Sequence, residues 1–144
     1  MRKLTTLFLG LILLTSCGEN EVDSSKLVER GGLTYEVNSE TPFTGISFTK
    51  YGDGQIHEKA EFKNGKRDGP SEKHHENGQL RSKGTYKDGK EEGPWVSYHK
   101  NGQLRLKGTL KNGKKDGPWV GYHENGTVWE TFTGTFKDGE KISD

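Results

Sequence analysis

One segment of ten residues returns nearly unchanged 24 residues later: Gly93-Pro94-Trp95-Val96-Ser97-Tyr98-His99-Lys100-Asn101-Gly102 is followed by Gly117-Pro118-Trp119-Val120-Gly121-Tyr122-His123-Glu124-Asn125-Gly126. Glycines keep the same interval elsewhere, at positions 45, 69, 93 and 117 and at 54, 78, 102 and 126. A period of roughly 20–50 residues is typical of a repeat architecture. The sequence therefore predicts a repeat protein with units near residues 45–68, 69–92, 93–116 and 117–141.

Inside each unit the apolar residues alternate with polar ones. Beyond Gly102 one face would carry Leu104, Leu106, Gly108 and Leu110, and the other Gln103, Arg105, Lys107, Thr109 and Lys111. Strict alternation of this kind indicates a half-buried strand. The small residues Ala60, Gly84 and Gly108 share one repeat position, where we expect an aromatic ring from a neighbouring strand to lie over the backbone.

Turn residues separate the predicted strands. Asn77-Gly78, Asn101-Gly102 and Asn125-Gly126 predict type I′ hairpin turns, and Asn64-Gly65, Asp88-Gly89 and Asn112-Gly113 predict the turns at the opposite ends of the strands. An acidic residue at 68, 92 and 116 precedes each Gly-Pro and is expected to bond its own local backbone. We predict an all-β fold over residues 33–144, an elongated antiparallel meander of stacked β-hairpin repeats. A two-residue insertion makes the last hairpin longer, which we expect to cover the open sheet edge.

The N-terminus resembles an export signal. Arg2 and Lys3 precede an apolar run from Leu4 to Leu14, which is shorter than the roughly 20 residues that a membrane-spanning helix needs. The run ends in Leu14-Thr15-Ser16-Cys17, which resembles the bacterial lipoprotein box. That resemblance implies a signal peptide at residues 1–16, cleavage between Ser16 and Cys17, and a lipid on Cys17. An ordinary signal peptide that happens to end near a cysteine is the alternative.

Residues 17–32 are predicted to form the lipidated cysteine and a flexible tether, because the stretch is polar. A tether of that length would hold the domain roughly 30–50 Å from a membrane. The expected location is therefore outside the cytoplasm, lipid-anchored to a bacterial membrane, and Gly18 after the cysteine fits sorting to an outer membrane. Loss of Arg2 and Lys3 leaves 20 basic and 21 acidic side chains. Such a balance disfavours nucleic acid as a partner.

The repeat resembles the MORN repeat (membrane occupation and recognition nexus), in the bacterial variant found in YwqK-family antitoxins. The resemblance lies in Gly-Pro-Trp-x-x-Tyr at 93–98 and 117–122, Asn-Gly-Gln-Leu at 77–80 and 101–104, and Lys-Asp/Asn-Gly-Lys at 87–90 and 111–114. It covers residues 33–141. It implies the hairpin fold and, through the family label, neutralisation of a toxin.

No arrangement of residues predicts catalysis. His75, His99 and His123 share one repeat position, but equivalent residues in successive hairpins lie roughly 9–10 Å apart, whereas zinc–nitrogen bonds are about 2 Å long. These imidazoles are expected at strand ends beside turns. We find no nucleophile elbow and no phosphate-binding loop. We therefore expect no enzyme activity, no metal, and no cofactor apart from the lipid on Cys17.

Two sets of side chains form the candidate binding surface. Lysines at one end of the strands would form a basic rail for an anionic surface, or simply solvated turn residues that discourage edge pairing: Lys63, Lys87 and Lys111. Aromatic residues would form the thin core, and any exposed part of them would offer a platform for protein or sugar: Trp95, Tyr98, Trp119, Tyr122 and Trp129.

Three functions remain open at this point. The preferred one is a non-catalytic, membrane-anchored scaffold lipoprotein that binds another protein of the cell envelope, since repeat sheets offer extended surfaces. The second is an antitoxin or immunity protein, which after export would meet only a toxin that acts in the envelope. The third is binding of cell-wall glycan.

Overall fold

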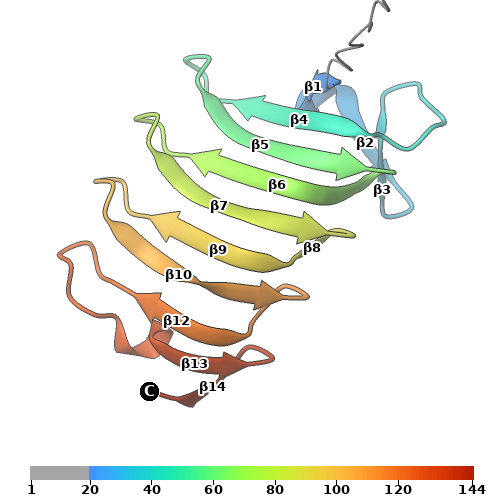
Figure 1. The fold of residues 1–144 in the computed structure, drawn as a ribbon. Coiled ribbons are helices and arrows are strands. Elements are labelled where there is room, and N and C mark those ends of the chain that lie inside the picture. The colour runs from blue at the N-terminus through green and yellow to red at the C-terminus, as the bar shows by residue number, and fades with distance from the viewer. Residues whose placement is uncertain (1–19) are drawn as a thin grey trace, which may run out of the picture.

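Residues 20–144 are described by the computed structural model, and they form one long, mostly antiparallel sheet with a short hairpin beside it (Figure 1). The sheet has twelve strands in the order β1-β4-β5-β6-β7-β9-β10-β12-β13-β14, with β8 pairing β7 and β11 pairing β10. Its strands are β1 (Glu21–Asp23), β4 (Gly45–Lys50), β5 (Ile56–Lys63), β6 (Lys66–His74), β7 (Leu80–Lys87), β8 (Lys90–Glu91), β9 (Gly93–Tyr98), β10 (Leu104–Lys111), β11 (Lys114–Lys115), β12 (Gly117–Gly121), β13 (Gly134–Lys137) and β14 (Glu140–Ser143).

The remaining elements are small. Strands β2 (Leu27–Arg30) and β3 (Leu33–Glu36) pair in a separate two-stranded sheet, and two 3-10 turns are η1 (Ser24–Lys26) and η2 (Glu130–Phe132). Within the described residues no helix is long and apolar enough to span a membrane. The predicted all-β meander of hairpins with a 24-residue period is confirmed, because consecutive strands pair in order along the sheet (Figure 1).

The predicted flexible tether is wrong over residues 20–32. Strand β1 pairs in parallel with β4, where Val22 lies opposite Ser47 and is 7% exposed. The hairpin β2–β3 docks on the first repeat turn, because Thr34 N–H donates to the carbonyl of Gly65. This segment folds although it has few apolar residues. Its backbone groups hydrogen-bond to an existing sheet edge, so it needs no hydrophobic core of its own. Cys17, Ser16 and the rest of the predicted signal peptide lie outside the described residues.

The two kinds of turn differ in backbone conformation. Asn64, Asp88 and Asn112 have positive φ, as do the glycines after them, which is the type I′ pattern. At Asn77 and its equivalents only the following glycine has positive φ, so type I′ is wrong there. The hairpin instead closes over three residues, with His75 N–H donating to the Gln79 carbonyl and the Asn77 side chain accepting from Gln79 N–H. An asparagine side chain that bonds the backbone two residues on stabilises this alternative.

A β-bulge interrupts the alternation in each of the hairpins β6–β7 and β9–β10. Leu104 pairs with Tyr98 and Leu106 with Ser97, so Arg105 is an extra residue without a partner. Arg81 is the extra residue of the preceding unit. We call the face that carries Trp95, Ser97 and Leu106 the inner face and the opposite one the outer face. A bulge re-aims the extra side chain, and both arginines line a groove on the inner face. The prediction that Arg105 faces outward with Lys107 is therefore wrong.

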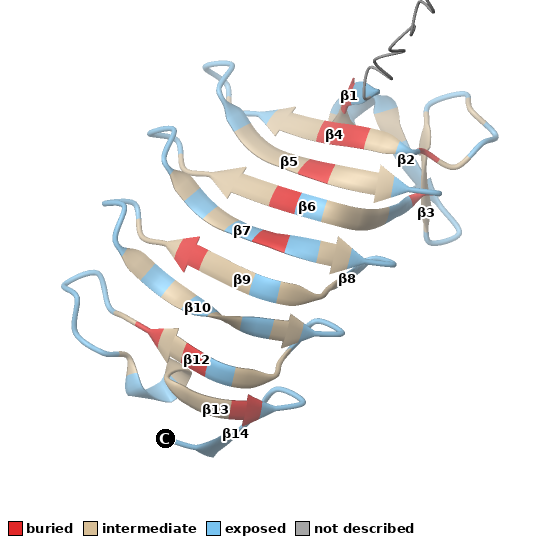
Figure 2. Ribbon diagram, viewed as in Figure 1, coloured by how far each residue is buried: buried red, intermediate tan, exposed pale blue. Residues whose placement is uncertain are grey.

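Buried residues lie in the middle of strands β4 to β7 and nearer the strand ends in β9 and β13 (Figure 2). Trp119 is 5% exposed and its ring lies over Gly108, while the Trp95 ring lies over Gly84. The expectation of an aromatic ring over a small residue is confirmed at these two glycines. It does not hold at Ala60, which pairs with Ser47 and Ser71 instead. Most of the core is therefore a row of rings and small residues on the inner face, while Ile46 is buried on the opposite face.

The insertion in the last unit folds over the inner face. Turn η2 places Phe132 against Trp129, with ring centroids 4.3 Å apart, and an added Cβ at Gly121 would meet both residues. The edge strand β14 is exposed along its whole length. The prediction that the longer hairpin covers the sheet edge is therefore wrong, because β14 remains the open edge and the insertion packs on Gly121 instead.

Candidate functional site

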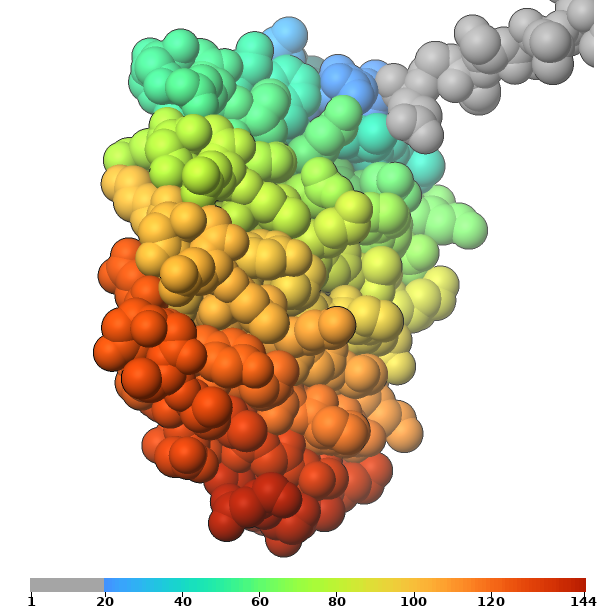
Figure 3. Space-filling model, turned by 60° about the vertical axis from the view of Figure 1, so that its left-hand side comes forward, coloured from blue at the N-terminus to red at the C-terminus, as the bar shows by residue number. Residues whose placement is uncertain are grey.

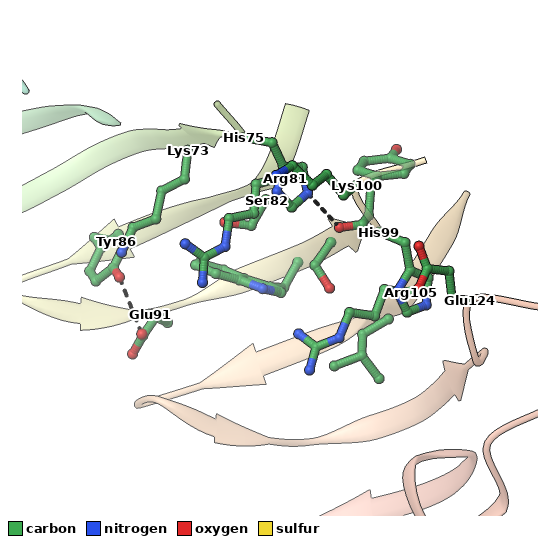
Figure 4. Close-up of a pocket in the computed structure, with 14 residues that line it drawn as sticks. Lys73, His75, Arg81, Ser82, Tyr86, Glu91, His99, Lys100, Arg105 and Glu124 are labelled. Carbon is green, nitrogen blue, oxygen red and sulfur yellow. Dashed lines mark hydrogen bonds between the residues drawn. The ribbon is translucent and has the colours of Figure 1, made fainter. Parts of the chain in front are cut away.

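The inner face is hollowed into a cavity of about 700 Å³ that spans the second and third units. We call it the central groove and define it by its basic side chains Lys73, Arg81, Lys100 and Arg105 and by its floor, Trp95 and Ser97. Figure 4 shows Arg81 and Arg105 entering it from two different strands, with His75 and His99 along its margin. In the space-filling view the units follow one another along an elongated body (Figure 3).

Positive charge predominates in the central groove. Only two carboxylates line it, and Glu91 accepts a hydrogen bond from the Tyr86 hydroxyl at 3.2 Å. Burial and the Glu91 charge raise the pKa of Tyr86, which keeps the phenol protonated as that donor. The other carboxylate, Glu124, belongs to a turn at the margin. The groove therefore has the electrostatic character of a site for an anionic group.

A charged cluster is linked to the groove through Lys73. Glu58 bonds Arg67 at 2.5 Å and lies 3.6 Å from Lys73. Burial opposes the ionised form of Glu58, but the hydrogen bond and charge of Arg67 outweigh it, so the pKa of this carboxyl is lower than usual. Arg67 also stacks between the Phe62 and Tyr86 rings. Lys73 therefore lines the groove but is paired with Glu58, whereas no ion pair is found for Arg81 or Arg105 among the described residues.

The structure places the five predicted aromatic residues in four different surroundings. Trp95 and Tyr98 line the central groove. Trp119 lies in the core, where its indole N–H donates to the carbonyl of Thr109 at 2.9 Å. Trp129 stacks on His123 and has the Arg105 guanidinium 5.8 Å from its ring centroid. Tyr122 is not a lining residue of the groove, and its backbone carbonyl hydrogen-bonds His99. Of the five predicted aromatic residues, Trp95 and Tyr98 are therefore the ones that a ligand in the groove would meet.

The histidines occupy strand ends beside the turns, as predicted. His75 and His99 each hydrogen-bond through Nε2 to the carbonyl of the tyrosine one unit ahead, Tyr98 and Tyr122, at 3.1 and 2.8 Å. Asn77 and Asn101 likewise donate to carbonyls of the following turn. Among the described residues no group of His, Cys, Asp and Glu has the geometry of a metal site. The histidine column is therefore a ladder that holds successive units in register.

The lysine rail lies at the opposite turns and is separate from the central groove. Lys63, Lys87 and Lys111 are exposed, and Lys87 pairs with Asp68 at 2.9 Å. Asp68 also accepts from the backbone N–H of Asp88, and Glu92 accepts from Asn112 N–H. The acidic column thus bonds the turn of the next unit, so the prediction of local bonding is wrong. These carboxylates lower the net charge of the rail.

Two features of the groove were missed in the sequence. Arg81 and Arg105 do share a repeat position, but strict alternation assigned that position to the outer face. Ser97 gave no signal, because it varies between units: Lys73, Ser97 and Gly121 occupy equivalent places. The repeat period was sufficient to find the arginine column, whereas the bulge that turns it inward is a property of the paired strands.

Comparison with known proteins gives one family. A sequence model described as the MORN repeat variant matches residues 43–64, 67–88, 91–112 and 115–138, together more than half of the chain. No curated protein matches the chain. The family match suggests a repeat module that binds protein or membrane.

Proposed function

The chain belongs to the MORN repeat variant family, and from that premise we propose a non-catalytic binding module, exported and held to the membrane by a lipid on Cys17, whose central groove engages another protein of the cell envelope. The proposal rests chiefly on the groove, which combines an aromatic floor with basic side chains from several strands. Arg, Trp and Tyr are the residue types enriched where partner proteins bind most strongly.

The repeat scaffold supports a protein ligand. The sheet is one layer thick, so its inner face stays accessible along successive units, and inter-unit bonds from histidine and asparagine side chains hold that face in shape. A pre-organised surface loses little conformational freedom when it binds. The groove is also open and polar, which suits a segment of a larger partner better than an enclosed small molecule.

The anchor follows from the sequence of the first 17 residues. Strand β1 begins at Glu21, so only residues 18–20 separate Cys17 from the sheet, an extended reach of about 10 Å. A lipid on Cys17 would therefore hold the β1 end of the sheet near the membrane, and β14 would be the far end. The groove between them would face partners in the envelope at a short distance from the lipid surface.

Photo-crosslinking in living cells tests the binding face. A photoreactive amino acid at position 98, in the groove, should give an adduct with one envelope protein after irradiation, because Tyr98 lines the groove. The same amino acid at position 96 is the matched control, since Val96 lies on the same strand but on the outer face. Adducts are separated by electrophoresis and identified by mass spectrometry.

Equal adducts from both positions would contradict a specific binding face. Retention of the protein on isolated cell wall, with no protein adduct, would replace the proposal with glycan binding. If the captured partner is toxic when it is expressed alone, the protein would instead be an antitoxin or immunity protein.

Replacement of Cys17 tests the anchor. Cys17→Ser should abolish incorporation of a palmitate analogue and move the protein from the membrane fraction to the soluble one, because a serine hydroxyl cannot form the thioether. Ser16→Ala keeps a small residue before the cysteine and should leave both labelling and fractionation unchanged. Membrane association of the Cys17→Ser variant at the level of the unaltered chain would disprove lipid anchoring.

A further inference from the structure

We propose that the central groove is a receptor for an acidic peptide segment, in which Arg81 and Arg105 bind two carboxylates and the Ser97 hydroxyl donates a hydrogen bond to the same segment. This rests on the proposed function and specifies the chemistry of the partner. Both arginines enter the groove from bulges that lie 24 residues apart in the chain.

The two arginines have no acidic partner within the described part of the chain. The ion pairs there involve other cations, including the third arginine of the inner face, Arg67, which is held by Glu58. A guanidinium presents five N–H donors in a planar fork that fits a carboxylate in two parallel hydrogen bonds. The guanidinium groups of Arg81 and Arg105 both line the central groove, and their N–H donors are available to a ligand.

The floor of the groove supplies a second, independent sign of a ligand. Ser97 is 7% exposed, and its buried Oγ has no hydrogen-bond partner. Buried hydroxyls almost always have a partner, and one without it lowers the stability of the unbound protein. Ser97 lies opposite Ser82 at the bottom of the groove. A ligand that accepts from this hydroxyl would satisfy it.

The spacing of the arginines selects the shape of the ligand. Strand β9 lies between β7 and β10, so the two positions are separated by two strand spacings, roughly 9–10 Å. In a polyproline-II segment residues i and i+3 lie on one side and about 9 Å apart. An Asp-x-x-Asp segment that crosses the strands would therefore place one carboxylate at each arginine. The segment would cross β9 at Ser97.

A defined peptide tests this assignment on the full-length chain purified in detergent. Binding of a fluorescein-labelled peptide with the core Asp-Pro-Pro-Asp is measured by anisotropy. Arg81→Gln combined with Arg105→Gln should weaken binding about 100-fold, because each replacement removes a charge-assisted pair. Lys83→Gln combined with Lys107→Gln removes the same charge from the same two strands on the outer face, and should change affinity less than about threefold. Ser97→Ala should weaken binding about fivefold without lowering the midpoint of urea denaturation.

Three results would overturn the inference. One is an Asn-Pro-Pro-Asn peptide that binds as tightly as the acidic one. Another is an equal loss of affinity in the arginine and lysine double variants, and the third is inorganic phosphate competing at the same concentration as the peptide. The proposed function fails separately: if the crosslinked adduct at position 98 persists in the arginine double variant, the groove binds a protein without reading carboxylates. If the peptide binds but cells give no adduct, the groove is a site for acidic peptides, and the proposal of an envelope protein as its partner is wrong.

Discussion

Trp119→Ala is expected to remove about 3–5 kcal/mol from the free energy of unfolding, the largest loss for any single side chain of this domain. Folded domains have only roughly 5–15 kcal/mol in total. Trp119 is the one tryptophan that is nearly fully buried, at 5% exposure, and its indole N–H bonds the carbonyl of Thr109. A single-layer sheet has no second layer that could move in to fill the space. Urea denaturation followed by circular dichroism measures the shift in midpoint.

Val120→Ala is the matched control, because it truncates the next residue on the outer face of the same strand. We expect a loss of less than about 1.5 kcal/mol there, since Val120 is only partly buried. If Trp119→Ala lost no more than Val120→Ala, the inner face would not be the core. Tryptophan fluorescence of Trp95 and Trp129 would show whether the remaining rings keep their surroundings.

Gly108→Ala should lower the free energy of unfolding by about 1–3 kcal/mol, although alanine is normally the better strand residue. A Cβ at position 108 would lie 2.2 Å from Cδ2 of Trp119, closer than any real contact. The φ of Gly108 is not positive, so the expected loss is steric and does not come from backbone strain. Thermal and urea unfolding of the variant measure it.

A double-mutant cycle separates the steric cause from others. In a Trp119→Ala background, Gly108→Ala should cost less than about 0.5 kcal/mol, because the ring that it meets is absent. Gly52→Ala controls for the substitution itself, since nothing lies within 4 Å of a Cβ there and its φ is ordinary. Additive losses in the cycle would show that the glycine is required for a reason other than the ring above it.

Most strands and turns of the fold could be predicted from the local sequence. Asn112-Gly113 and its equivalents formed the expected type I′ turns, since the sequence supplied residues that tolerate positive φ. Asn101-Gly102 is the same dipeptide but forms a different turn, because the Asn101 side chain accepts a hydrogen bond from the backbone N–H of Gln103. Turn position can thus be read from such a pair, whereas turn type depends on how the flanking strands pair.

The residues of the central groove depend on strand pairing more than the turns do. Arg105 sits between Leu104 and Leu106, so alternation placed it with the solvent-facing lysines. The partner strand offers one residue fewer than alternation requires, and the extra residue turns inward. Residues 20–32 are a similar case, since their polar composition indicates a tether in isolation, whereas β1 finds a partner in the sheet edge and β2 finds one in β3.

The amino-acid sequence alone determined the repeat period, the strand and turn positions and the rings stacked over glycines, because these depend on residues that are neighbours in the chain or recur at one interval. Tertiary structure alone decided which side chains share the central groove, why Ser97 is buried without a partner, and where the folded domain begins. Those properties arise from bulges, strand register and edge pairing, which exist only once separate strands have come together.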